Sequence, residues 1–223
     1  MKSYSGTAMP GRLLGWLLAC CLLSGMSLPL RADPGPVELL QAVTDQLLEM
    51  IRRDPDILGD PVRLRAVASE FILPHIDFVT LSRWVLGKHW REASREQRNR
   101  FVEQFRELLL NSYLRSVTGY RETTVRFLPL RGSQPDGRAK VDAEVMQPNG
   151  PPIHAEFRLH RVDDRWLIYD VAVEGISLVA THRSSFSREI SNSGIAGLLS
   201  RMEEMNGAGA GRGAAAEVKA PQQ

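Results

Sequence analysis

The chain has 223 residues, of which 43% are hydrophobic, 24% are charged and 7% are aromatic. This composition is typical of a globular protein and excludes a collagen, a low-complexity polymer and a wholly disordered chain. The formal net charge is +2 and becomes −1 when Lys2, Arg12 and Arg31 of the acid-free first 32 residues are subtracted. Nucleic-acid binding requires clustered excess Lys and Arg, so we expect no nucleic-acid partner.

The N-terminal segment has the pattern of a secretory signal peptide. Lys2 and Arg12 precede a largely apolar run over residues 13–23, which is well short of the roughly 20 residues that a membrane-spanning helix needs. We therefore predict a signal peptide over residues 1–32 and an exported protein. Residues 17–20 loosely resemble a lipoprotein signal, which stays open as an alternative. Cleavage after Ser27 and cleavage after Ala32 are the two alternatives for its removal.

Both cysteines of the chain, Cys20 and Cys21, lie inside this predicted signal peptide. Its removal would leave a chain without cysteine, so we expect no disulfide, no catalytic thiolate and no cysteine-ligated metal.

Apolar residues recur at helical spacing in the first part of the remaining chain, in stretches separated by Pro or Gly. Ser94 and Gln97 have the form of a capping box at the start of the longest stretch. We expect helices over residues 37–53, 61–73, 78–86 and 95 to about 119.

From about residue 125 the apolar residues recur at a period of 2, typical of strands, in place of the helical period of 3.6. Four alternating segments with short turns between them, in the regions of residues 125–127, 139–145, 153–159 and 167–173, predict an antiparallel meander with one buried face. A closing helical region follows over about 178–205, broken near Ser193-Gly194.

The predicted fold class is α+β: a curled antiparallel sheet of about four strands packed with N-terminal and C-terminal helices, in an NTF2-like or cone-like layout. The expected domains are the signal peptide at 1–32, one α+β domain at 33–205 and a Gly- and Ala-rich disordered tail at 206–223.

Motifs for catalysis are missing from the sequence. The five histidines lack metal-ligand spacing, and no phosphate-cradling or dinucleotide-binding loop occurs. Ser177 follows a strand but is better explained as a helix N-cap than as a nucleophile. We therefore predict no catalytic residue, no metal and no cofactor.

Two patterns leave alternatives open. The Arg-rich stretch over residues 83–106 is interleaved with Glu at helical spacing, so it is either a solvated face with ion pairs or a docking surface for an acidic partner or a phosphate headgroup. The inward strand positions Ala139, Ala143 and Ala155 are small, which indicates either close packing or space left for a ligand.

Three segments carry a resemblance to a known family. They are residues 73–78 (LPHIDF), residues 85–94 (VLGKHWREAS) and residues 166–179 (WLIYDVAVEGISLV). Over about residues 36–205 the chain resembles the MlaC family of periplasmic phospholipid-binding proteins, also called toluene-tolerance auxiliary proteins.

The resemblance implies a periplasmic shuttle that holds phospholipid tails between a curled sheet and helices, with bound phospholipid as cargo. Its implied partners are an inner-membrane ABC transporter complex with an MCE-domain subunit and an outer-membrane lipoprotein–porin complex. We expect a monomer that is not an enzyme.

Candidate lipid-binding residues follow from the inward strand positions and the facing helices. A role in the solid core is the alternative for each. They are Leu81, Val85, Phe105, Leu109, Tyr113, Val125, Phe127, Val141, Val145, Phe157, Tyr169 and Val171.

Two other classes of protein remain possible. One is a protein-docking module with a filled core, which a large apolar cavity would argue against. The other is an isomerase-like enzyme on a cone-shaped fold, in which Tyr113 or Tyr169 would act with a buried acid.

Overall fold

The computed structural model describes residues 34–114, 124–131, 137–147 and 150–211. The predicted signal peptide, the expected end of the fourth helix near Gly119 and residues 212–223 of the predicted tail lie outside these ranges. The fold below is that of the unit that begins at Pro34.

The first helices begin where proline or a capping side chain favours a first turn. The carboxylate of Asp60 accepts hydrogen bonds from the backbone N–H groups of Val62 and Arg63, at 2.9 and 3.2 Å. The predicted second helix is divided into three short pieces, and Pro74 lies in the last of them. The elements are α2 (Pro36–Arg53), η2 (Pro55–Gly59), α3 (Pro61–Val67), the π-helical turn η3 (Ala68–Ile72) and the 3₁₀ turn η4 (Leu73–His75).

The later helices include the longest ones. The capping box is confirmed: Ser94 Oγ accepts from the Gln97 N–H at 3.1 Å, and Gln97 Oε1 accepts from the Ser94 N–H at 2.9 Å. Ser177 caps the last helix by accepting from the Ala180 N–H at 3.1 Å. The elements are α4 (Phe78–Leu86), α5 (His89–Glu92), α6 (Arg95–Tyr113) and α7 (Leu178–Gly211).

The sheet confirms the predicted meander and adds one short strand. Its strands run in the order β1-β2-β3-β4-β5, and each neighbouring pair is antiparallel. The fifth strand has two residues, too few to produce the alternation by which the other four were predicted. The strands are β1 (Thr124–Phe127), β2 (Arg138–Met146), β3 (Ile153–Val162), β4 (Arg165–Val173) and β5 (Ile176–Ser177). The α+β fold class is confirmed.

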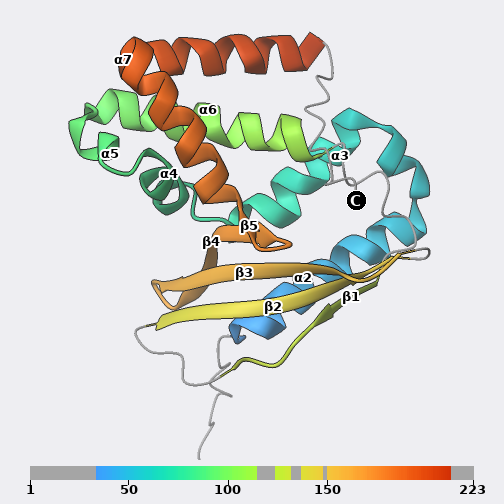
Figure 1. Ribbon diagram of the computed structural model, residues 1–223. Helices are drawn as coiled ribbons and strands as arrows, with labels where there is room; N and C mark the ends of the chain where they lie inside the picture. The colour runs from blue at the N-terminus through green and yellow to red at the C-terminus, as the bar shows by residue number, and fades with distance from the viewer. Residues whose placement is uncertain (1–33, 115–123, 132–136, 148–149, 212–223) are drawn as a thin grey trace, which may run out of the picture. The chain divides into compact units, whose positions relative to one another are not determined.

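The two faces of the sheet differ in chemistry. One carries ion pairs such as Lys140 to Glu156, at 2.6 Å, and Arg158 to Glu156, at 2.8 Å. The opposite face is apolar, and α2 covers part of it: Leu40 packs with Val141 and Leu159, which are fully buried. The helices α4, α6 and α7 gather on one side of the sheet (Figure 1).

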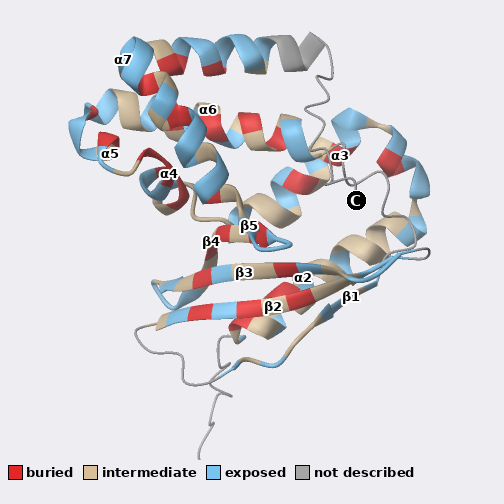
Figure 2. Cartoon of the chain, viewed as in Figure 1, coloured by how far each residue is buried: buried red, intermediate tan, exposed pale blue. Residues whose placement is uncertain are grey.

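These three helices have a core of their own. Phe101, Phe105 and Phe186 form an aromatic cluster with ring centroids 5.5 to 5.7 Å apart. Figure 2 shows buried residues on the helix faces that meet one another and exposed residues on the outer faces. The helical layer is therefore stabilised by its own packing as well as by the sheet.

Asp77 joins the helices to the sheet. Its N–H donates to the Ile168 carbonyl of β4 at 2.8 Å, and its carboxylate caps α4 through the Thr80 N–H at 2.9 Å. His160 Nε2 lies 2.9 Å from the same carboxylate. Burial alone would raise the pKa of Asp77, but the hydrogen bonds from Thr80 and the charge of His160 together lower it.

The C-terminal helix changes direction at the predicted break. Gly194 has φ 72° and ψ 176° inside α7, a conformation open mainly to glycine. The helix then runs past Met205 to Gly211. Asn206, placed in the tail by the sequence analysis, instead donates to the Gln104 carbonyl of α6 at 2.9 Å.

We expect Gly194→Ala to lower the free energy of unfolding by about 1–3 kcal/mol, because a Cβ strains this backbone conformation. Denaturant unfolding of the purified protein measures this. Gly207→Ala is the matched control, since Gly207 is exposed, helical and has no neighbour near an added Cβ; it should be neutral or stabilising. Equal losses in both variants would contradict a special role for the kink.

Candidate functional site

The first cavity lies at the end of the apolar sheet face that α2 does not fill. Its volume is about 310 Å³, within the range of small-molecule sites. Thr44 is the one lining residue with a polar side chain among the residues described. The lining residues are Thr44, Leu47, Leu48, Met50, Ile51, Ile57, Leu64, Val67, Ala68, Ile72, Leu114, Val125, Val145, Ile153, Ala155 and Val173.

The second cavity, of about 300 Å³, lies between β4, the segment over residues 68–78 and the helices α4 and α6. Its walls are also apolar, except for Arg106 and Tyr113 of α6. The lining residues are Ala68, Ile72, Leu73, Ile76, Phe78, Leu81, Arg106, Leu109, Leu110, Tyr113, Leu114, Ile168, Val171, Val173 and Leu178.

The two cavities are neighbours. Ala68, Ile72, Leu114 and Val173 line both of them, so the two spaces share a wall of small and medium side chains. Two of these residues belong to the π-helical turn η3. Together the cavities form one apolar region between the sheet and the helices.

Side-chain size along the strands explains why space remains. At one end of the sheet, Leu159 and Phe157 stand opposite Ala139 and Val141 and pack with α2. At the other end, Ala155 stands opposite Val173, and both line a cavity. The small strand residues therefore have both of the roles left open above: Ala139 permits close packing, whereas Ala155 leaves space.

The structure brings half of the predicted site residues to the cavities. Val125 and Val145 line the first cavity, and Leu81, Leu109, Tyr113 and Val171 line the second.

The other predicted site residues lie in packed regions. Val85 and Phe105 are buried in the core of the helical layer, because α7 covers their side of α4 and α6. Phe127, Val141 and Phe157 belong to the core beneath α2.

Tyr169 is displaced from the cavity by an irregularity in β4. The register of β3 and β4 shifts between Arg158 and Leu159, so that Ile168 stands opposite Leu159. The Tyr169 ring instead contacts Trp84 and His160, with ring centroids 6.4 and 5.2 Å away. Period-2 counting cannot detect such a shift.

The sequence analysis missed the contribution of the N-terminal helices to the cavities. Leu47 and Ile51 of α2, with Leu64 of α3, line the first cavity. The apolar stripe of α2 was visible in the sequence, but nothing local distinguishes the part that packs on the sheet from the part that faces a cavity.

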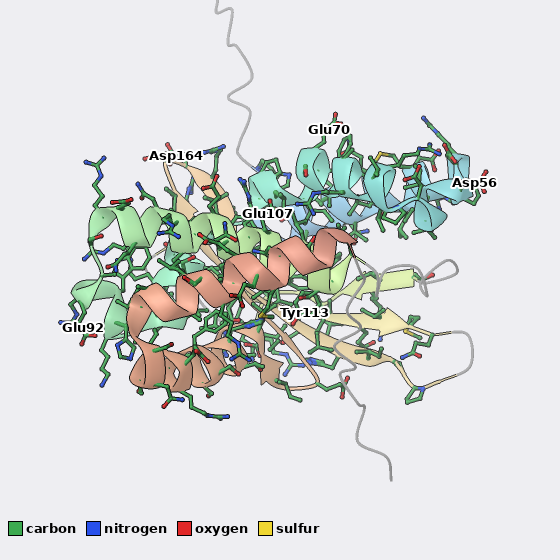
Figure 3. All side chains as sticks on the ribbon, turned by 90° about the horizontal axis from the view of Figure 1, so that it is seen from above. Asp56, Glu70, Glu92, Glu107, Tyr113 and Asp164 are labelled. Atoms are coloured by element: carbon green, nitrogen blue, oxygen red, sulfur yellow. The ribbon has the colours of Figure 1, made fainter. Side chains whose placement is uncertain are left out.

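No carboxylate lines either cavity within the described part of the chain. In Figure 3 the labelled carboxylates of Asp56, Glu70, Glu92 and Asp164 lie at the periphery of the view, whereas Glu107 and Tyr113 of α6 lie further inside it. Partial burial raises the pKa of Tyr113, so its hydroxyl is protonated at neutral pH, as that of an unperturbed tyrosine also is.

The buried acid nearest in sequence to the tyrosine on β4 has a structural role. Asp170 accepts from Ser177 Oγ at 2.7 Å and from the Val179 N–H at 3.1 Å, and so supports the start of α7. Both carboxylate oxygens of Asp170 are therefore engaged at the start of this helix.

Several arginines of the Arg-rich stretch over residues 83–106 make structural contacts. Arg98 donates to the Trp90 carbonyl at 2.7 Å and packs over the Trp90 ring, and Arg100 pairs with Glu203 at 2.5 Å. Among the described residues, no group of His, Cys, Asp and Glu is arranged to hold a metal ion. The described helices also include none with the length and hydrophobicity needed to cross a bilayer.

Comparisons with known proteins agree with this geometry. The chain is 24% identical over 177 residues to the intermembrane phospholipid transport system binding protein MlaC of Haemophilus influenzae, covering 78% of this chain and 83% of that protein. It is 24% identical over 176 residues to the toluene tolerance protein ttg2D of Pseudomonas putida, covering 78% and 81%.

One solved structure is similar to this chain over nearly the whole of the solved chain. The phospholipid-binding protein from Ralstonia solanacearum, determined in complex with a phospholipid, superposes with a TM-score of 0.71 and 27% identity, covering 77% of this chain and 97% of that one. The family model of the MlaC protein matches residues 41–204. The chain therefore belongs to the MlaC family.

Proposed function

We propose that this protein is a periplasmic phospholipid carrier that holds acyl chains in the two adjoining cavities. The observation that carries the proposal is an apolar region of two cavities, of about 310 and 300 Å³, in a chain whose relatives are named for phospholipid binding and transport. An apolar cavity of this size costs stability when empty, which favours a resident apolar ligand.

Energetics favour transfer by direct contact between proteins. A phospholipid with two chains contains roughly 30 methylenes, and exposing them at about 0.8 kcal/mol each would cost on the order of 24 kcal/mol. Imperfect burial and ordering reduce this figure, and non-covalent affinities level off near about −18 to −21 kcal/mol. Unassisted release into water would still be very slow.

The carrier would exchange lipid with an inner-membrane ABC transporter complex that has an MCE-domain subunit and with an outer-membrane lipoprotein–porin complex. It would act as a monomer exported by its signal peptide, without catalysis and without a cofactor other than its cargo. The cavities also argue against the alternative of a docking module with a filled core.

Two single substitutions on β2, compared with each other, test which end of the sheet holds cargo. Val145→Trp would place a large ring in the first cavity, so we expect bound phospholipid to fall by about half or more while the free energy of unfolding changes by less than about 1 kcal/mol. The measurements are lipid extracted per mole of purified protein and denaturant unfolding.

Val141→Trp is the matched control. Val141 lies on the same strand and the same face but is fully buried against Leu40 and Leu159, so overpacking should destabilise the protein by about 1–3 kcal/mol or more. If Val145→Trp destabilises as much as Val141→Trp and retains its lipid, Val145 belongs to solid core.

Retention of cargo tests the transfer mechanism. Purified protein loaded with fluorescent phospholipid and mixed with plain phospholipid vesicles should keep most of that lipid for about an hour or longer. A fatty acid with one chain of the same length exposes half as many methylenes and should leave much faster. Rapid loss of the two-chain lipid to plain vesicles would refute transfer by direct contact.

A further inference from the structure

Arg106 is the one charged residue among the described residues that line the two cavities. It lies on α6 one turn before Leu109 and two turns before Tyr113, and all three line the second cavity. The Arg106 side chain is 44% exposed. Because it both lines the cavity and reaches solvent, Arg106 marks the mouth of the second cavity.

Among the described residues, the guanidinium of Arg106 has one distant partner. In the described part of the chain its ion pair is a long one, 3.8 Å from Nε to Glu107 Oε1. The other oxygen of that carboxylate, Oε2, pairs with Arg65 Nη2. Glu107 is therefore already engaged, and the fork of N–H donors on Arg106 remains available.

Arg106 combines this capacity with an apolar neighbour. A guanidinium binds phosphate oxygens through two parallel hydrogen bonds, which a lysine cannot reproduce. The cavity beside it accepts hydrocarbon, as its apolar lining shows. An amphiphile satisfies both when it carries an anionic oxygen group close to an apolar chain, as a phospholipid does through the glycerol that joins its phosphate to its acyl chains.

We propose that Arg106 binds the phosphate of a phospholipid whose acyl chain occupies the second cavity. This inference rests on the proposed carrier function and assigns the place of the headgroup. The phosphate lies at the mouth, where Arg106 replaces part of its hydration, and the alcohol esterified to it extends into solvent. Recognition thus selects the phosphate and not the headgroup alcohol.

Arg106→Gln tests this by comparing two lipids with identical acyl chains, phosphatidylglycerol and diacylglycerol. The affinity of the variant for phosphatidylglycerol should fall about five- to tenfold, because a partly exposed charge-assisted contact is lost. Its affinity for diacylglycerol, which has no phosphate, should not change. Arg106→Lys should recover part of the loss, and the difference between wild type and Arg106→Gln should shrink at high salt.

Arg95→Gln is the matched control, with the same change of charge on the same helix. Arg95 is exposed at the start of α6 and lines neither cavity, and it lies roughly 16 Å along the helix from Arg106. The Arg95→Gln variant should bind both lipids with the affinity of the wild type. An equal loss for phosphatidylglycerol in Arg95→Gln would show a general charge effect and overturn the assignment.

Other outcomes separate the inference from the proposed function. An equal loss of both lipids in Arg106→Gln would mean that Arg106 only packs, which overturns the inference and leaves the carrier intact. A wild type that binds neither lipid refutes the carrier itself. Inorganic phosphate alone should not shift the melting temperature of the wild type; a shift that Arg106→Gln abolishes would reassign the residue to a free anion.

Discussion

The apolar face of the sheet is the surface on which the rest of this structure depends. An antiparallel sheet with one apolar face must bury that face, and α2 buries only part of it, through Leu40 against Val141 and Leu159. At the far end the strands carry the smaller Val145, Ala155 and Val173, and helices surround that end without filling it. The cavities are the part of the face that the protein does not cover with its own side chains.

The packing of the surrounding elements makes this incomplete burial tolerable. The helices α4, α6 and α7 have an aromatic core of their own, and a smaller cluster around Leu58 stabilises the turn between α2 and α3. Asp77 holds the helical layer against β4 through the Ile168 carbonyl and His160. The cavities thus lie where separately packed regions meet, so the fold does not need a filled centre.

Sequence periodicity predicted the secondary structure well because its signals are local. The capping box at Ser94, the break at Gly194 and the alternating strands each depend on a few neighbouring residues. The division of the second helix at η3 and the register shift before Tyr169 left no comparable pattern in the sequence. Both features depend on tertiary packing.

The candidate site was predicted only in part for the same reason. Inward-facing positions such as Val141 and Val145 have the same sequence signature, yet one is solid core and the other lines a cavity. What separates them is which part of α2 lies opposite, and that depends on long-range packing. The role of Arg106 was equally hidden, since its spacing matches that of the arginines that make structural contacts.

Native mass spectrometry of the protein, exported and purified without detergent, tests the central claim most directly. A carrier that closes its apolar cavities around cargo should emerge with about one phospholipid per chain, seen as a mass increment that organic extraction removes. A protein that emerges empty, and then takes up no phospholipid from vesicles or detergent, would contradict the account. The cavities would in that case be a defect of packing and not a binding site.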